Sequence, residues 1–199
     1  MSHEDRRFDP KKCDALLAPE RWQRWNPPEL LARTGVRPGQ RVLDVGCGPG
    51  FWTFPLAEIV GPAGEVLALD VSVDMLAALT ARRPPAQVRT MQSELPRIDL
   101  PRAYVDFIWA AFVFHEVQPP AALAEALYLV LRPHGRLALF DWRPDAASSG
   151  GPPRHHRFSS QQVCAYLSVA GLYAPREIWR NKDAYLITAQ GANPSETTG

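Results

Sequence analysis

Two acidic residues and a group of glycines occur where a chain could hold a nucleotide-like ligand. Asp44 stands just before Gly46, Gly48 and Gly50, and Asp70 follows 20 residues after the last of these glycines. Glycines at alternate positions let the backbone turn sharply and let a ligand approach the main chain. An acid at the end of a strand accepts ribose hydroxyls in dinucleotide-binding enzymes. These residues therefore predict a site for a nucleoside-containing ligand, with a tight turn that binds nothing as the alternative.

The elements around these residues are those of an open α/β sheet. Residues 41–45 form a short apolar run typical of a buried strand, and residues 52–60 carry a helical apolar pattern. Residues 65–70 form a second apolar run, which ends on Asp70. The glycines thus lie between the end of a strand and the start of a helix, where ligands bind in α/β folds.

The alternation of strands and helices continues to the end of the chain and predicts a parallel sheet covered by helices. Further helices are expected near 73–81, 123–131 and 160–170, the last with a capping box from Ser159 to Gln162, and further strands at 88–91, 106–111, 136–141, 173–180 and 184–189. Residues 181–183 are hairpin-like, so the last two strands should be antiparallel. A Pro- and Gly-rich stretch at 143–158 is expected to be a long loop.

The N-terminal region predicts a helical cap over residues 1–40. Prolines at 19, 27 and 28 divide residues 13–34, so we expect two short helices over the ligand site or its rim, with Asn26 capping the second. Phe8 is expected to dock on the domain, and residues 191–199 are expected to form a flexible tail. The length of 199 residues suits a single domain, 1–199.

Composition excludes several classes of partner. The formal net charge of +1 provides no broad cationic field, so we expect neither a nucleic-acid nor a membrane partner. The N-terminus lacks the apolar core of a signal peptide, which predicts a cytoplasmic protein. The three cysteines show no metal-binding or redox spacing, and no metal site is expected.

The spacing of the glycines differs from that of dinucleotide-binding proteins and resembles that of another family. It reads G-x-G-x-G after an acid, whereas the dinucleotide fingerprint is G-x-G-x-x-G. Together with residues 69–76 and 131–137, residues 42–50 resemble the class I S-adenosylmethionine (SAM) methyltransferases, and specifically the ubiquinone/menaquinone-biosynthesis C-methyltransferase-like group. The group usually has a second glycine where His134 stands. The resemblance implies a Rossmann-like, seven-stranded, mostly parallel sheet in the order 3-2-1-4-5-7-6, with strand 7 antiparallel and helices on both faces.

The same resemblance implies SAM as the cofactor. Asp44 would meet the methionine ammonium and Asp70 the ribose hydroxyls, while the carbonyls of Ala110 and Ala111 would also face the ammonium. The full set of implied cofactor contacts is Asp44, Gly46, Cys47, Gly48, Gly50, Asp70, Val71, Met75, Ser93, Glu94, Ala110 and Ala111.

An acceptor that must lose a proton needs a base, and His115 is the candidate because imidazole titrates near neutral pH. A histidine that only packs in the loop after the fourth strand is the alternative. Acceptor contacts are expected from aromatic and basic residues, with plain packing or solvation as their alternative. These candidates are Trp25, Phe112, Phe114, Trp142, His155 and Arg157.

These expectations combine into one function. The chain should transfer a methyl group from SAM to a small acceptor, apolar or aromatic, by C- or O-methylation, as a monomer or homodimer. A SAM-binding protein without catalysis is one alternative, and a nicotinamide-dependent oxidoreductase is the other. Asp70 fits the oxidoreductase, but the glycine spacing and the terminal hairpin do not.

Overall fold

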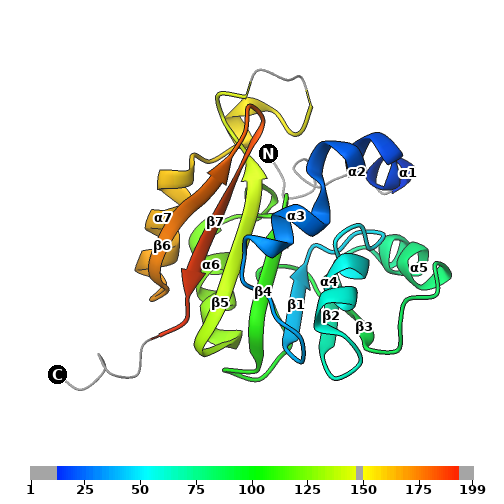
Figure 1. Cartoon of the computed structure of the whole chain (residues 1–199). Helices are drawn as coiled ribbons and strands as arrows, with labels where there is room; N and C mark the ends of the chain where they lie inside the picture. Colours follow the sequence, from blue (N-terminus) through cyan, green and yellow to red (C-terminus); the bar gives the residue numbers. More distant parts are fainter. Residues whose placement is uncertain (1–12, 147–149, 193–199) are drawn as a thin grey trace. The chain divides into compact units, whose positions relative to one another are not determined.

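A computed structural model describes residues 13–146 and 150–192 of the chain. The strands form a seven-stranded sheet in the order β3-β2-β1-β4-β5-β7-β6, which confirms the predicted order (Figure 1). By their internal contacts the described residues fall into two compact units, one ending at Glu94 and the other beginning at Leu95. The single domain over 1–199 stays a prediction. The docking of Phe8 and most of the expected tail lie outside the described residues.

Three short helices open the first unit, where two had been expected. They are α1 (Cys13–Leu17), α2 (Pro19–Trp25) and α3 (Pro27–Ala32), and a proline begins each of the last two. Proline suits a first helical turn because the amide hydrogen that it lacks has no partner there. Asn26 joins α2 to α3 in a left-handed conformation (φ 43°) and makes no side-chain cap. The predicted asparagine cap is therefore wrong. The side-chain amide nitrogen of Asn26 instead donates to Glu29 Oε2 at 2.8 Å.

The predicted strands of the first unit are confirmed. β1 (Arg41–Val45), α4 (Thr53–Val60), β2 (Glu65–Asp70), α5 (Val73–Ala81) and β3 (Val88–Gln92) follow in order. β2 pairs in parallel with both β1 and β3, and the register sets Val45 beside Leu69 and Asp70 beside Gln92. Parallel strands in this register bring their carboxyl ends to one edge of the sheet. The acid that ends β2 is therefore held close to the residues that follow β1.

The second unit also begins with a parallel strand pair. β4 (Val105–Ala111) is followed by the 3-10 helix η3 (Phe114–Glu116), α6 (Pro120–Val130) and β5 (Leu131–Trp142). β5 pairs with β4 in parallel, so that Ala111 lies beside Phe140. β5 is longer than predicted because residues 131–135 join it, with a register shift between Val105 and Phe107 on β4.

The end of the chain forms the predicted hairpin. The elements are the 3-10 helix η4 (Arg154–His156), α7 (Ser160–Val169), β6 (Tyr173–Arg180) and β7 (Ala184–Gln190). β7 is antiparallel to both β5 and β6. Its turn is held by Asn181, whose Oδ1 accepts from the amides of Asp183 and Ala184 at 2.8 and 2.9 Å. In Figure 1, α7 lies along this hairpin, and it packs on β6 and α6.

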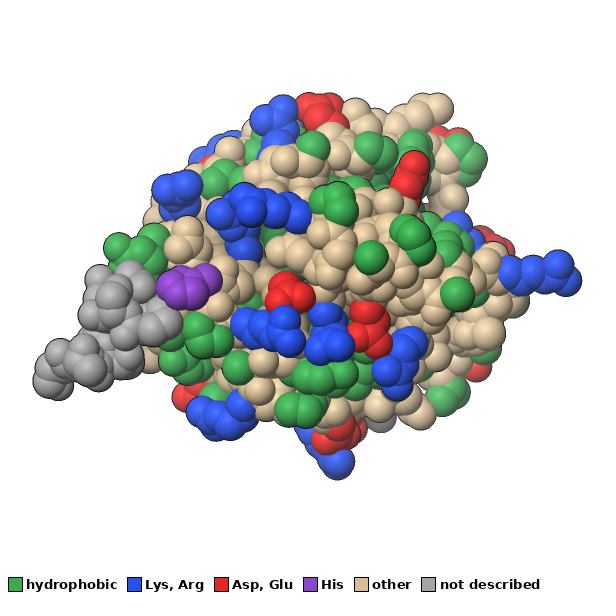
Figure 2. All heavy atoms as spheres, turned by 60° about the horizontal axis from the view of Figure 1, so that its bottom comes forward, with side chains coloured by type: hydrophobic (Ala, Val, Ile, Leu, Met, Phe, Trp, Pro, Cys, Tyr) green, Lys and Arg blue, Asp and Glu red, His purple; other side chains and the backbone are tan. Residues whose placement is uncertain are grey.

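The surface carries charges of both signs close together. Figure 2 shows Lys and Arg side chains lying next to Asp and Glu side chains on one face. In the first unit Glu65 pairs with both Arg41 and Arg89, at 2.6 and 3.1 Å. No helix of the described residues combines the length and the apolar character needed to cross a membrane.

The capping box of α7 predicts a measurable share of stability. Ser159 accepts from the Gln162 amide, and Gln162 Oε1 accepts from the Ser159 amide. We expect Ser159→Ala to lower the free energy of unfolding by about 1 kcal/mol in urea titrations, because one helix-start amide loses its partner. Ser168→Ala, at an exposed site in the same helix, is the control and should cost nothing. Equal effects of the two changes would contradict the role of the cap.

Candidate functional site

Asp44 is a buried carboxylate one residue before the end of β1. Only 1% of the residue is exposed, and its Oδ2 accepts a hydrogen bond of 2.7 Å from the hydroxyl of Thr53, the first residue of α4. Burial raises the pKa of Asp44 to about 7, the Thr53 hydrogen bond opposes that rise, and the charge of Asp70 adds to it. A carboxylate in this position favours a cation as its ligand.

The glycine turn has the backbone that the sequence predicts. Gly46, Gly48 and Gly50 have φ values of 68°, 53° and 91°, in the left-handed region that side chains disfavour. At Gly50 an added Cβ would lie 3.0 Å from the Phe54 ring and 3.2 Å from Leu79. The amides of Gly46 and Cys47 both donate to the Leu69 carbonyl, at 2.8 and 2.9 Å, so the turn is tied to β2.

Asp70 binds the glycine turn directly. Its Oδ2 accepts from the Gly48 amide at 2.8 Å, and its Oδ1 accepts from the Ser72 amide at 2.9 Å. The Asp70 carbonyl also accepts from the Ser93 amide at 3.2 Å, which brings the end of β3 to the same edge. Asp70 is therefore bound to the turn that follows Asp44, and its charge acts on the buried Asp44. A carboxylate oxygen can accept more than one hydrogen bond, so these amides leave room for ribose hydroxyls.

Arg82 holds the turn from the end of α5, and the sequence analysis missed it. Its Nη1 donates to the Pro49 carbonyl at 2.7 Å, and its guanidinium lies 4.3 Å from the centre of the Phe54 ring. Cys47 turns its side chain into a buried cluster with Ala68 and Leu79. Burial raises the pKa of the Cys47 thiol well above its ordinary value, so the residue packs and offers a ligand only its backbone.

The N-terminal helices contact the glycine turn and Phe51, the residue that follows it. Leu16 of α1 lies 3.5 Å from the position that a Cβ on Gly48 would take. Trp22 of α2 makes an edge contact with Phe51 at 5.7 Å, and the Arg21 guanidinium lies 4.7 Å from the same ring. Apolar and cation–π contacts of this kind hold a short helix that has little stability of its own.

The remaining cofactor candidates divide between the two units. In the first unit Met75 and Ser93 are buried, Val71 is half-buried and Glu94 is exposed. Ala110 and Ala111 end β4 in the second unit and are both buried. Their contacts with a cofactor stay predictions.

In the second unit His115 forms a buried pair with Asp141. His115 Nδ1 lies 2.7 Å from Asp141 Oδ1, and the two side chains are 4% and 3% exposed. The parallel register of β4 and β5 makes the pair: Asp141 directly follows Phe140, which lies beside Ala111, and η3 turns His115 back toward it. The Asp141 carboxylate also accepts from the amides of His115 and Trp142, at 3.3 and 2.7 Å.

Aromatic rings gather at the same strand ends. Phe112 has a φ of 58°, a conformation that costs energy for a residue with a side chain and is often found at functional sites. Its ring lies 4.7 Å from Phe140 and 4.8 Å from Trp142. Phe114, by contrast, is fully buried against Phe158 and Tyr166, which gives it a packing role. The acceptor contacts expected of Phe112, Phe114 and Trp142 stay predictions.

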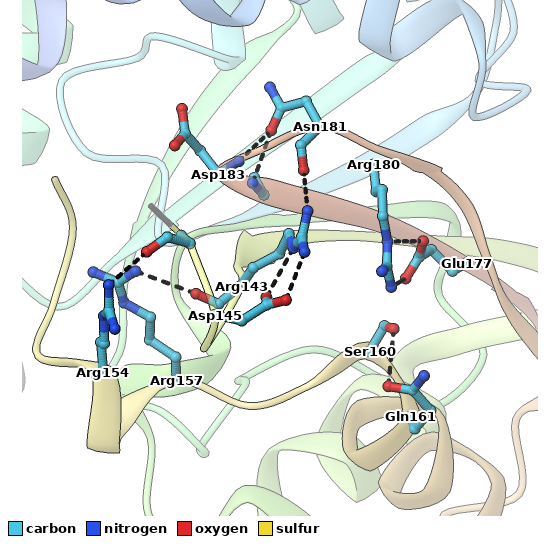
Figure 3. A network of polar contacts seen from close by, with 12 residues as sticks. Arg143, Asp145, Arg154, Arg157, Ser160, Gln161, Glu177, Arg180, Asn181 and Asp183 are labelled. Carbon is cyan, nitrogen blue, oxygen red and sulfur yellow. Dashed lines mark hydrogen bonds and ion pairs between the residues drawn. The ribbon is translucent and has the colours of Figure 1, made fainter. Parts of the chain in front are cut away.

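Arg157 organises the described part of the loop that follows β5. Its Nε, Nη1 and Nη2 donate to the carbonyls of Pro152, Arg143 and Gly150, at 2.9, 3.2 and 2.7 Å. Figure 3 shows the bond from Arg157 to Arg143. The guanidinium lies 5.6 Å from the centre of the Trp142 ring. The neighbouring Arg154 donates to the Ala146 carbonyl at 3.0 Å. This geometry uses the Arg157 charge inside the loop, so the predicted substrate contact would have to share it.

Two other acceptor candidates have different surroundings. His155 is exposed and makes a ring contact of 4.3 Å with the buried His156. Trp25, in the first unit, is 3% exposed, and its ring lies 4.6 Å from the Arg24 guanidinium. Neither arrangement identifies a substrate contact.

The methyltransferase domain family matches residues 42–135. The demethylmenaquinone methyltransferase of Geobacillus sp. (strain WCH70) is 29% identical over 133 residues, 65% of this chain and 56% of that protein. The UbiE ubiquinone/menaquinone biosynthesis C-methyltransferase of Azotobacter vinelandii is 31% identical over 174 residues, 85% of this chain and 63% of that protein. The chain thus spans less than two thirds of these curated relatives.

One solved structure is similar over nearly its whole length. The crystal structure of a SAM-dependent methyltransferase from Aquifex aeolicus has a TM-score of 0.85 and 34% identity, and the similarity covers 92% of this chain and 98% of that chain. Identity at this level over almost the whole of both chains extends the likeness from fold to sequence.

Proposed function

The chain belongs to the SAM-dependent methyltransferases, and we propose that it transfers a methyl group from SAM to a small aromatic acceptor of the quinol type. Two relatives support the acceptor, because one is named for methylating demethylmenaquinone and the other for C-methylation in ubiquinone and menaquinone biosynthesis. The aromatic side chains at the ends of β4 and β5 suit a flat acceptor. A non-catalytic SAM-binding protein and a nicotinamide-dependent oxidoreductase are not favoured by these similarities.

The residues of the first unit fit the cofactor. When bound, SAM supplies an electrophilic methyl group on a sulfonium, and its methionine part carries an ammonium. The buried Asp44 carboxylate would hold that ammonium, since a cation repays part of the cost of burying the acid. Asp70 would accept the ribose hydroxyls, and the left-handed glycines would let the nucleoside approach the backbone. Positioning by these groups would supply much of the rate enhancement.

One observation carries the proposal. Asp44 stands two residues before the glycine turn and is buried against Thr53, while Asp70, at the end of the neighbouring strand β2, binds the Gly48 amide. Burial and, to a smaller extent, the charge of Asp70 disfavour the charged form of Asp44, so the two acids would be costly in a turn that binds nothing. They are useful where a ligand brings an ammonium group and ribose hydroxyls, as SAM does. A nicotinamide dinucleotide has ribose hydroxyls but no ammonium, and its anionic pyrophosphate would be repelled by the two acids.

Calorimetry with S-adenosylhomocysteine and with NAD tests the cofactor. We expect S-adenosylhomocysteine to bind and NAD not to bind. Asp70→Asn should weaken S-adenosylhomocysteine binding by about 1–3 kcal/mol, the range for hydrogen bonds to a charged group. Turnover with SAM and a panel of phenols, quinols and amines then separates an enzyme from a protein that only binds SAM.

Asp74→Asn is the matched control for Asp70→Asn. Asp74 is an exposed acid four residues away in the first turn of α5, so the same change in charge should leave the affinity unaltered. An equal loss in both variants would mean that net charge, and not a contact of Asp70, decides affinity. Tight binding of NAD in place of S-adenosylhomocysteine would overturn the proposed function itself.

A further inference from the structure

The buried pair of His115 and Asp141 has the parts of a general base. The Asp141 carboxylate is held by three donors, namely the His115 ring, the His115 amide and the Trp142 amide. A carboxylate only accepts hydrogen bonds, so the hydrogen between Asp141 Oδ1 and the ring nitrogen at 2.7 Å belongs to the ring. In the neutral ring the hydrogen then lies on Nδ1, and Nε2 carries the lone pair. The pair therefore fixes which nitrogen can accept a proton.

The charges around the ring favour its protonated form. Burial lowers the pKa of His115, but the charge and hydrogen bond of Asp141 and the charge of Glu116 raise it overall, against a smaller opposing effect of Arg157. Glu116 Oε1 lies 4.0 Å from Nε2, on the side of the ring away from Asp141. A proton that reaches Nε2 is therefore stabilised by carboxylates at both ends of the imidazole.

We infer that Asp141 is a positioning residue that holds His115 with Nε2 as proton acceptor, and that the methyl acceptor is a weakly acidic phenol or enol. This inference rests on the proposed methyl transfer. A phenol or enol becomes a strong nucleophile only when its O–H proton is removed, whereas a neutral amine attacks with the lone pair that it already has. A base that is oriented and stabilised as an imidazolium serves the first acceptor and is not needed by the second.

The proton balance is simple. The O–H bond of the acceptor breaks, its proton goes to His115 Nε2, and the electron pair stays on the acceptor as phenolate or enolate. In the overall reaction a methyl group replaces one acceptor hydrogen, and S-adenosylhomocysteine and one proton are released. The imidazolium gives its proton back to water or to the methylated product, which restores the starting tautomer.

The first test compares pH profiles of Asp141→Asn and the wild type. The probes are SAM with 1,4-naphthohydroquinone or catechol under anaerobic conditions. At pH 7 we expect kcat of the variant to fall at least 100-fold with KM changed less than about threefold, because an amide allows the wrong tautomer. The variant should recover toward wild-type kcat as the pH approaches that at which the acceptor ionises in solution. A merely structural loss would lower kcat by the same factor at every pH and would overturn the inference.

The matched control is Asp106→Asn. Asp106 is an acid near the other end of β4 that pairs with Arg132 at 2.6 Å, so the same substitution there should leave the pH profile unchanged. His115→Gln serves as a second variant if Asp141→Asn does not fold. It keeps a hydrogen-bonding side chain but cannot take up the proton, and it should show the same recovery at high pH.

The second test does not depend on turnover. The ¹⁵N chemical shifts of the His115 ring should report a hydrogen on Nδ1 in the wild type, and a changed tautomer balance in Asp141→Asn. A wild-type ring with its hydrogen on Nε2 would overturn the assignment of the base. Both the wild type and Asp141→Asn should bind S-adenosylhomocysteine. If the wild type does not bind it, the proposed function is wrong. Binding without turnover of either phenolic probe defeats only the acceptor class.

Discussion

Replacing Asp44 with asparagine is expected to make the protein more stable and to abolish most of its cofactor affinity. The pKa of the buried carboxylate is raised from 3.8 to about 7, which corresponds to roughly 4 kcal/mol of unfavourable interaction in the charged form. The asparagine side chain carries no charge. We expect Asp44→Asn to raise the free energy of unfolding at pH 8 by about 1–3 kcal/mol, less than the full amount because a buried amide needs its own partners.

The pH dependence gives this prediction its sign. A group whose pKa is higher in the folded than in the unfolded protein stabilises the fold at pH values below its unfolded pKa, and this stabilisation is lost as the pH rises toward its folded pKa. Asp44 therefore weakens the wild type increasingly from about pH 4 to pH 7. The advantage of Asp44→Asn in urea titrations should be roughly a third of its full size at pH 5 and reach its full size by about pH 8.

Cofactor affinity should change in the opposite direction. Loss of the charge that would hold the methionine ammonium is expected to weaken S-adenosylhomocysteine binding at pH 8 by about 2–3 kcal/mol, or roughly 30- to 150-fold. Below pH 7 the wild type should also bind less tightly, because its Asp44 must give up a proton to hold the cation. Calorimetry over this pH range measures both effects.

Thr53→Val separates the charge from the packing. It keeps the carboxylate but removes the hydroxyl that donates to Asp44 at 2.7 Å, with almost no change in volume. We expect it to lower stability by about 1–2 kcal/mol, most clearly above pH 7, where the acid is charged. If Asp44→Asn and Thr53→Val both lowered stability at pH 8, burial of the carboxylate would not be costly. Unchanged affinity in Asp44→Asn would remove the acid from the cofactor site.

The strands and the glycine turn could be predicted because their signals are local. An apolar run such as residues 41–45 identifies a buried strand, and the alternate glycines at 46, 48 and 50 permit the left-handed backbone that the structure has there. The order of the strands is not local. It came from the resemblance of short motifs to a known family, and the structure confirms it.

The partners of the site residues were missed for a physical reason. Thr53 is nine residues from Asp44, Gly48 is 22 from Asp70, and Asp141 is 26 from His115. Each of these pairs is brought into contact by the register of two strands or by the angle at which a helix leaves a strand. The spacing of residues in the sequence determines neither. The position of Asp141 was nonetheless informative. Asp141 ends the strand that was expected to lie beside the strand preceding His115, so the two residues could have been predicted to meet.

Backbone acceptors leave even less trace in a sequence. The three carbonyls that Arg157 binds belong to Arg143, Gly150 and Pro152, residues with no common chemistry. For a basic residue in a Pro- and Gly-rich loop, the sequence therefore predicts a substrate contact or solvation, and not a role inside the loop. The structure supports a second role for it, in folding the loop, and substitution can separate the two.

We expect Arg157→Lys to destabilise the protein by about 2–4 kcal/mol in urea titrations. The guanidinium donates from three nitrogens in different directions, is only 8% exposed, and lies against the Trp142 ring. A lysine ammonium is a single point from which these carbonyls cannot all be reached, so buried acceptors would lose their partner. Arg154→Lys is the matched control, because Arg154 is exposed and has one such bond, to Ala146. It should change stability by less than about 0.5 kcal/mol.

Limited proteolysis locates the effect of Arg157→Lys. Cleavage after β5, within residues 143–158, should become much faster in this variant than in Arg154→Lys or the wild type, since Arg157 joins both ends of the described loop. A residue that served only to bind an anionic acceptor would behave differently. Lysine would then keep the charge, the fold and the resistance to protease, and the loss would appear in KM for the acceptor alone. The choice between the two roles of Arg157 thus depends on whether stability or KM changes.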